Sequence, residues 1–289
     1  MTSLAIFDIG GHTFAVSGGR EVDMVSASHA FKPFVTDNDI AEWTCSFGNN
    51  ITVGDNGTEL YDFVFKETNS RCSFSRHEGL YCFEMFDNTD NSLLVRMVYK
   101  PGSSSVLSTS CHDYPCLRFS LWFAYSLLSS FSSISFVHSS VVVYRGRAVL
   151  FLGESGTGKS THTRLWRDNI QGSRLLNDDS PIIALEDDRV MVYGSPWSGK
   201  TPCYQPYKFP LAAVVRLSQA PHNRIQRLST PEAFAALQPS LPPALMQDED
   251  FADRLVEIIS STISAAPFYH LECLPDADAA RLSLHTVFE

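Results

Sequence analysis

Eight consecutive residues, Gly153 to Ser160, have the types and spacing of a phosphate-binding loop. The pattern is a glycine, four residues, and then Gly-Lys-Ser or Gly-Lys-Thr, and this sequence matches it throughout. Glycines let consecutive backbone N–H groups turn toward phosphate oxygens, and the N-terminus of a following helix adds partial positive charge. A lysine in this position reaches the β- and γ-phosphates, and the serine hydroxyl binds Mg²⁺.

We therefore predict a nucleotide site, with ATP and Mg²⁺ as cofactors. The residues predicted to bind the nucleotide are Gly153, Glu154, Ser155, Gly156, Thr157, Gly158, Lys159, Ser160 and Thr161. The flanks support this prediction, because the apolar run 148–152 precedes the loop and residues 161–166 can continue as a helix. A glycine-rich turn that binds nothing is the alternative, but such a turn does not require Lys-Ser after its last glycine.

Two acidic residues, Asp178 and Asp179, follow the short apolar strand formed by Leu175 and Leu176. A nucleotide-dependent kinase needs one carboxylate for the metal and another to accept the proton of the acceptor hydroxyl. Adjacent residues on a strand point to opposite faces, so the two acids are predicted to divide these roles. The alternative is a solvated turn before the following Ser-Pro.

Two further candidates lie before and after the acids. His138 precedes the segments 141–144 and 147–152, whose antiparallel pairing would return it to the phosphate end of the sheet. Lys200 lies in the segment 194–202, which we expect to be a mobile loop that closes over the transferring phosphoryl group. The alternative for His138 is an ordinary core or surface histidine. The alternative for the segment 194–202 is a surface turn.

The elements that must position these residues indicate a two-domain α/β (α+β) protein. Residues 1–110 contain short β-like segments separated by turn residues, including 14–16, 51–53, 60–65, and a predicted hairpin of 80–86 with 93–99. Residues 111–289 begin with a helix over 115–130 and continue with the strands around the loop. They also hold a hairpin of 182–185 with 190–193, a buried strand over 211–217, and helices over 251–265 and 276–287 separated by a strand. We predict a mixed sheet in this second domain.

The composition excludes several classes of protein. The chain has 289 residues, of which 44% are hydrophobic, so a substantial core is expected. A net charge of −10 argues against nucleic acid as a partner, and no apolar run is long enough for a membrane span.

The N-terminus lacks the pattern of a signal peptide, and the seven cysteines lack disulfide-like or metal-like pairing. Cys111 and Cys116 form the only local cluster, without a second pair for zinc. A cytoplasmic protein with reduced thiols is expected.

The series of His138, two strands, Gly-Glu-Ser-Gly-Thr-Gly-Lys-Ser, a helix and Asn177-Asp178-Asp179 resembles the catalytic domain of HPr kinase/phosphorylase. It is more distantly similar to ATP-dependent phosphoenolpyruvate carboxykinase. The resemblance implies that Asp178 activates the acceptor hydroxyl, that Asp179 and Ser160 bind the metal, and that His138 supports them. It also implies a homo-oligomer. An arginine- and glycine-rich segment of that family is replaced here by Trp197 to Lys200.

The leading hypothesis is an ATP- and Mg²⁺-dependent phosphotransferase with catalytic residues Asp178, Asp179, His138 and Lys200. Its acceptor is a serine-type hydroxyl of a protein, peptide or small molecule. A catalytically silent ATP-binding regulatory or scaffold protein is the alternative. A switch GTPase is excluded because the sequence has no Asn-Lys-x-Asp motif. Carboxykinase chemistry is disfavoured because we find no basic residues to hold a dicarboxylate.

Overall fold

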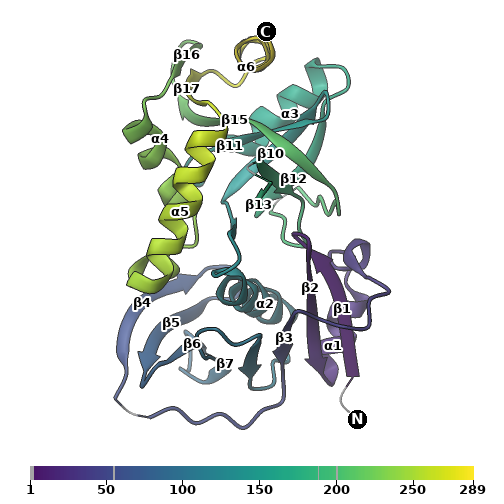
Figure 1. Ribbon diagram of the computed structural model, residues 1–289, viewed down its shortest axis with the longest axis vertical. Coiled ribbons are helices and arrows are strands. Elements are labelled where there is room, and N and C mark those ends of the chain that lie inside the picture. The colour runs from purple at the N-terminus through teal and green to yellow at the C-terminus, as the bar shows by residue number, and fades with distance from the viewer. Residues whose placement is uncertain (1–2, 55, 188, 200) are drawn as a thin grey trace. The chain divides into compact units, whose positions relative to one another are not determined.

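The computed structural model describes residues 3–54, 56–187, 189–199 and 201–289. The chain divides into two compact units. The first contains Met1–Ser132 and Ala244–Ala252, and the second contains Ser133–Pro243 and Asp253–Glu289. The described residues form two β-sheets and six α-helices, which is a mixed α/β composition (Figure 1). None of the helices in the described residues is both long and apolar enough to cross a bilayer.

The first unit is built on an eight-stranded sheet with the strand order β1-β2-β3-β8-β7-β6-β5-β4. The strands are β1 (Ser3–Ile9), β2 (His12–Gly18), β3 (Trp43–Ser46), β4 (Thr58–Phe65), β5 (Ser70–His77), β6 (Leu80–Asp87), β7 (Leu93–Tyr99) and β8 (Ser105–Ser108). The helices are α1 (Arg20–Ala27) and α2 (Tyr114–Ser129). The predicted hairpin of β6 and β7 is confirmed, because the two strands pair in antiparallel register.

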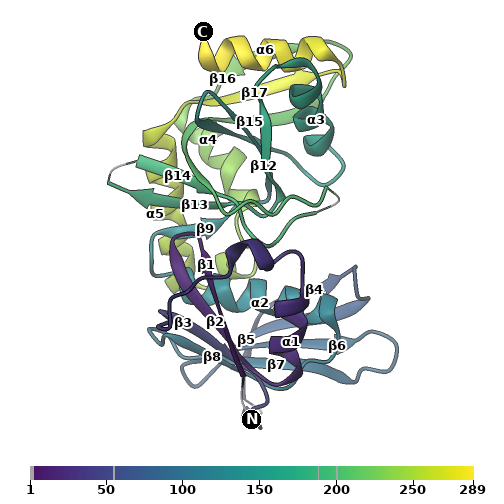
Figure 2. The ribbon, with the colours of Figure 1, turned by 90° about the vertical axis from the view of Figure 1, so that its right-hand side faces the viewer.

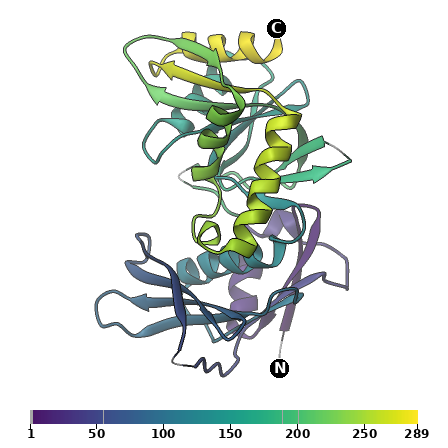
Figure 3. The ribbon, with the colours of Figure 1, turned by 60° about the vertical axis from the view of Figure 1, so that its left-hand side comes forward.

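Helix α2 lies along one face of this sheet (Figure 3). Asp113 caps its N-terminus by accepting a hydrogen bond from the backbone N–H of Cys116 at 3.0 Å. Phe123 of α2 stacks on Phe83 with ring centroids 4.0 Å apart and meets Phe74 edge-on. Because of this packing, the first unit continues beyond residue 110, where the sequence predicted a boundary, and it includes α2.

One predicted strand of the first unit is wrong. Residues 51–53 form no strand, and the backbone carbonyl of Ile51 accepts a hydrogen bond from the side chain of Arg96 at 3.3 Å. A run of three residues between Asn50 and Gly54 is too short to compete for a place in the sheet ladder, whose edge is already formed by β4. The short helix α1 was not predicted.

The second unit contains a nine-stranded sheet, in which the main strand order is β12-β10-β11-β15-β14-β13-β9, and β17 pairs with β15 and β16. The strands are β9 (Ile134–Phe136), β10 (Ser139–Tyr144), β11 (Arg147–Leu152), β12 (Arg174–Asp179), β13 (Ile182–Glu186), β14 (Arg189–Tyr193), β15 (Lys208–Gln219), β16 (Arg224–Arg227) and β17 (Phe268–Cys273). The helices are α3 (Lys159–Asn169), α4 (Thr230–Leu237), α5 (Glu249–Ala265) and α6 (Ala277–Phe288), and α5 begins in the segment assigned to the first unit.

The hairpin of β10 and β11 confirms the pairing predicted from the sequence. Arg145 and Gly146 connect the strands, and both have positive φ angles, of 48° and 72°. Two consecutive residues with positive φ form the tight turn whose twist matches an antiparallel hairpin. The hairpin brings the start of β10 back to the end of β11, where the glycine-rich loop begins.

Strands β11, β15 and β17 run parallel to one another. Their carboxyl ends therefore share one edge of the sheet, which is the usual location of ligand sites in such sheets. Helices α3 and α6 pack against each other beside this sheet (Figure 2). The core between them includes Phe151 of β11 and Trp166 of α3, both 0% exposed. Truncating a buried residue as large as Trp166 to alanine costs about 3–5 kcal/mol.

Candidate functional site

The glycine-rich loop lies between the end of β11 at Leu152 and the start of α3 at Lys159. Gly156 and Gly158 have φ angles of 86° and 110°, which residues with a Cβ rarely adopt. The Thr157 hydroxyl donates to the carbonyl of Glu154 at 2.7 Å and closes the turn. The first N–H groups of α3 have no partner within the helix, so the loop presents backbone donors and the positive end of the helix dipole.

The ammonium group of Lys159 is folded back onto this loop. It donates to the carbonyl of Gly153 at 2.7 Å and to that of Glu154 at 3.3 Å. It also donates to Nε2 of His138 at 2.8 Å. Burial lowers the pKa of Lys159, although the carboxylates of Asp179 and Asp178 oppose this shift. A phosphate that enters the loop would compete for this ammonium group.

His138 reaches the loop as the sequence predicted, because the hairpin returns it to this end of the sheet. Its backbone N–H donates to the carbonyl of Ser240 at 2.6 Å, which fixes the residue before β10 begins. A lysine ammonium only donates, so Nε2 of His138 accepts and its proton lies on Nδ1. Burial lowers the pKa of His138, and the charge of Lys159 lowers it further, against the opposite effect of Asp179 and Asp178.

Asp178 lies beside Ser160. The serine hydroxyl donates to Oδ1 of Asp178 at 2.9 Å. Asp178 is only 4% exposed, and its Oδ2 atom is buried without a hydrogen-bond partner among the described residues. A buried carboxylate oxygen without a partner is costly unless a ligand or ion satisfies it. Together with the Ser160 hydroxyl, this oxygen forms an oxygen donor pair of the kind that Mg²⁺ prefers.

Asp179 lies beside His138. Its Oδ1 is 3.5 Å from Nδ1 of His138, and its side chain is 42% exposed. Its Oδ2 accepts from the hydroxyl of Ser180 at 3.1 Å. The φ angle of Asp179 is 141°, a region rarely occupied by residues other than glycine. Strain of this kind persists only where surrounding contacts hold the backbone in place.

Those contacts come from the segment 195–199. Asn177 is 0% exposed, and its side-chain amide donates to the carbonyl of Trp197 at 3.0 Å and to that of Ser195 at 3.3 Å. Its Oδ1 accepts from the backbone N–H of Ser180 at 3.0 Å. The backbone N–H of Gly199 donates to the carbonyl of Asp178 at 2.5 Å. The backbone on both sides of the two acids is therefore fixed.

The sequence suggested a mobile loop over 194–202, but residues 194–198 are buried and hydrogen-bonded, whereas Gly199 and Pro202 are exposed. Trp197 is 3% exposed and Ser198 is 5% exposed, and Ser198 bridges to Asp179 in antiparallel fashion. A Cβ on Gly199 would lie 3.1 Å from the carbonyl oxygen of Asp178. Lys200, the predicted catalytic lysine, lies outside the described residues.

The structure brings five of the predicted residues together through the contacts described above. Lys159 meets His138, His138 meets Asp179, and Ser160 meets Asp178. The predicted metal pair of Ser160 and Asp179 is not joined by a direct contact, since Asp178 takes the place beside Ser160. The side chains of Glu154 and Ser155 are exposed at the tip of the loop.

Asn177 was not predicted as part of the candidate site, although it belongs to the Asn-Asp-Asp series. The available signal was an amide directly after the apolar pair Leu175 and Leu176, because a buried amide needs several partners. Cys111 and Cys116 are both buried and free. In the part of the chain that the structure describes, no group of three or more His, Cys, Asp or Glu side chains is arranged to hold a metal ion.

No family model matches the sequence, and no curated protein matches it. Solved structures do match. One is the Hpr(Ser) kinase/phosphatase from Coxiella burnetii, which is 12% identical to this chain, with a TM-score of 0.30. That match covers 53% of this chain and 87% of the Coxiella chain.

Proposed function

We propose that this protein is an ATP- and Mg²⁺-dependent phosphotransferase that acts on a serine-type hydroxyl of a protein, peptide or small molecule. The observation that carries the proposal is the convergence of Lys159, His138 and Asp179. Lys159 is a cation at a phosphate loop, and it contacts a histidine that lies beside a partly exposed carboxylate. A loop that only bound nucleotide would not require a histidine and a carboxylate beside its lysine.

The donor nucleotide would place its phosphates in the loop 153–158. Backbone N–H groups and the N-terminus of α3 would face the phosphate oxygens, and Lys159 would exchange its contacts with Gly153 and Glu154 for the β- and γ-phosphates. The overall charge of −10 does not oppose this arrangement, because the attraction is local to the loop.

The Ser160 hydroxyl and the unpartnered Oδ2 of Asp178 would hold Mg²⁺. When bound, the ion neutralises charge on the phosphate oxygens. This assigns the metal to Asp178 and leaves Asp179 for the acceptor, which is the reverse of the division implied by the family resemblance. The support for the reversal is the pairing itself, because the buried acid contacts Ser160 and the partly exposed acid contacts His138.

Asp179 would accept the proton of the acceptor hydroxyl. The acceptor oxygen forms a bond to the γ-phosphorus, the bond from that phosphorus to the β–γ bridging oxygen breaks, and ADP leaves with the electron pair. Nδ1–H of His138 faces Asp179 and would orient its carboxylate. The network of Asn177 around the acids would hold this geometry.

The test is transfer of label from γ-labelled ATP. The protein is incubated with labelled ATP, Mg²⁺ and a lysate of its source, and the labelled products are identified. The Asp179→Asn variant is the matched control, because it should bind nucleotide without producing label. If the wild-type protein binds ATP tightly and labels no acceptor in any fraction, the catalytically silent regulatory function replaces the kinase.

A further inference from the structure

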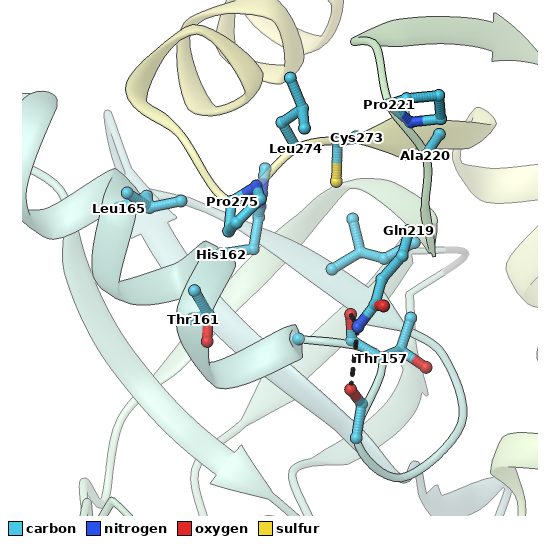
Figure 4. Close-up of a pocket in the computed structure, with 13 residues that line it drawn as sticks. Thr157, Thr161, His162, Leu165, Gln219, Ala220, Pro221, Cys273, Leu274 and Pro275 are labelled. Atoms are coloured by element: carbon cyan, nitrogen blue, oxygen red, sulfur yellow. Dashed lines mark hydrogen bonds between the residues drawn. The ribbon is translucent and has the colours of Figure 1, made fainter.

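The side chain of Gln219 connects the end of β15 to the glycine-rich loop (Figure 4). Its amide nitrogen Nε2 donates to the carbonyl of Gly156 at 3.3 Å and to that of Thr157 at 3.5 Å. Gln219 takes no part in the nucleotide contacts proposed above, and it is 62 positions from Thr157 in the sequence. The loop is therefore tied to a strand other than the one that it follows.

The peptide groups that Gln219 contacts belong to the part of the loop with the most conformational freedom. Gly156 and Gly158 flank Thr157, and both have positive φ angles. A glycine adopts such angles because it lacks a Cβ, and for the same reason it leaves them easily. Within the loop, the backbone N–H and the hydroxyl of Thr157 both donate to the carbonyl of Glu154, at 3.1 and 2.7 Å. These two bonds close the turn without fixing the peptide group between Thr157 and Gly158.

Holding a carbonyl also fixes the N–H group on the other side of the same peptide bond. A trans peptide group is planar, so its C=O and N–H point in opposite directions, and no peptide bond of the described residues is cis. The carbonyl of Thr157 shares its peptide group with the N–H of Gly158, which makes no hydrogen bond with the described residues. Gln219 draws this carbonyl toward β15, so the Gly158 N–H points away from the strand and is available to a phosphate oxygen.

Strand β15 gives the amide of Gln219 a rigid support. Gln219 is the last residue of the strand and lies opposite Cys273 in the parallel pairing with β17. The backbone N–H of Ala220, the next residue, donates to the carbonyl of Cys273 at 3.2 Å. On its other side β15 pairs with β11, where Arg216 lies opposite Leu152 at the start of the loop. The amide thus reaches the loop from a strand that is aligned with the one carrying it.

We infer that Gln219 is a positioning residue that orients the Gly158 N–H toward the phosphates of the donor nucleotide. The inference rests on the proposed function, because it concerns the phosphate contacts of the same site. Gln219 acts through the backbone of the loop and not on the transferring phosphoryl group. Its loss should therefore weaken the binding of the phosphate chain and leave the chemical step unchanged.

The first experiment measures the affinity for the Mg²⁺ complex of inorganic tripolyphosphate by isothermal titration calorimetry. This probe contains the phosphate chain without a base or a ribose. Gln219→Met has a similar length but no donor, and it should weaken binding by about three- to tenfold. Gln219→Asn keeps the amide but is one methylene group shorter, so it should lose the contact and weaken binding to a similar extent.

Gln226→Met is the matched control. Gln226 is an exposed glutamine of β16, and its side chain makes no hydrogen bond with the described residues. It should bind tripolyphosphate as the wild-type protein does. Gln219 is also exposed, so all of these variants should have the wild-type midpoint of urea unfolding.

Two further readouts distinguish positioning from a purely structural role. The first is the backbone amide resonance of Gly158 in proton–nitrogen correlation spectra of the ligand-free protein. Gln219→Met should shift this resonance, because the orientation of its peptide group changes, whereas Gln226→Met should leave it in place. The second is transfer from γ-labelled ATP, in which Gln219→Met should raise the KM for ATP and leave kcat unchanged.

The outcomes separate this inference from the proposed function. If the wild-type protein and Gln219→Met bind tripolyphosphate equally, the loop binds phosphate without help from Gln219, and the inference alone fails. If the wild-type protein binds neither tripolyphosphate nor Mg²⁺–ATP, the proposed function fails and the inference fails with it. A fall in kcat at an unchanged KM would place Gln219 in the chemical step and overturn its role in positioning the loop.

Discussion

Lys159 donates from Nζ to Nε2 of His138 at 2.8 Å, although the residues are 21 positions apart in the sequence. The contact joins the start of α3 to the residue just before β10. It also requires a neutral imidazole, because the ammonium has only donors. His138 lies on the proposed acceptor side of the site. It therefore holds Lys159, which is the residue that contacts phosphate in a phosphate-binding loop.

Replacing Lys159 with methionine should weaken Mg²⁺–ATP binding by at least about 100-fold, because two charge-assisted contacts to the phosphates are lost. Calorimetric titration of the variant measures this loss. Lys208→Met is the matched control, since Lys208 pairs with Glu186 at 2.6 Å and is 46% exposed. An unchanged affinity for ATP in the Lys159 variant would exclude the loop as the phosphate site.

The same substitution should raise the pKa of His138. The charge of Lys159 is the second cause, after burial, of the lowered pKa of this histidine, and it is removed in Lys159→Met. Titration of the imidazole by NMR in both proteins gives the difference. The Lys208→Met protein should show the wild-type titration of His138, and a lower pKa in Lys159→Met would contradict the contact.

Asp178→Asn and Asp179→Asn should have different effects. Asp179→Asn should keep Mg²⁺–nucleotide binding and lower phosphoryl transfer by about 10²- to 10⁴-fold, because it loses the proton acceptor. Asp178→Asn should instead weaken nucleotide binding in the presence of Mg²⁺ and have a smaller effect in its absence. Binding and single-turnover transfer, measured on each variant, distinguish the roles. The opposite pattern would restore the division that the family resemblance implies.

Asn177→Ala should lower the free energy of unfolding by about 1–3 kcal/mol, because buried partners lose their hydrogen bonds. These partners include the carbonyl of Trp197 and the backbone N–H of Ser180. The midpoint of urea unfolding, followed by circular dichroism, measures the change. Asn169→Ala removes an exposed amide at the end of α3 and serves as the control. Equal midpoints for the two variants would show that the network around the acids does not stabilise the fold.

The stability of the protein should fall as the pH decreases from about 6.5 to about 4, in part because of His162. Burial holds the pKa of this histidine at about 4 in the folded state, against about 6.5 when exposed. The unfolded state therefore takes up the proton first, and folding loses about 3 kcal/mol across this range. His162→Gln cannot titrate and can still bond to Ser283, so its stability should fall less. Urea unfolding at pH 7, 5.5 and 4 compares the two proteins, and parallel curves would contradict the prediction.

The sequence by itself determined the glycine-rich loop, the hairpin of β10 and β11, and the end of the sheet to which His138 returns. These features depend on local physics, since glycines permit positive φ, short turns fix the strand register, and an antiparallel hairpin returns to its starting edge. The position of Asp178 and Asp179 at the end of a strand was also predicted, because they follow the short apolar run of Leu175 and Leu176.

The tertiary structure decided which acid meets which partner. Strand alternation predicts that Asp178 and Asp179 face different ways, but it cannot say which of them faces Ser160, because that depends on how α3 packs beside β10 and β12. The burial of Asn177 and the connection of Gln219 to the loop depend on residues distant in the sequence. Contacts of this kind arise only when separate segments pack together, so no local pattern encodes them.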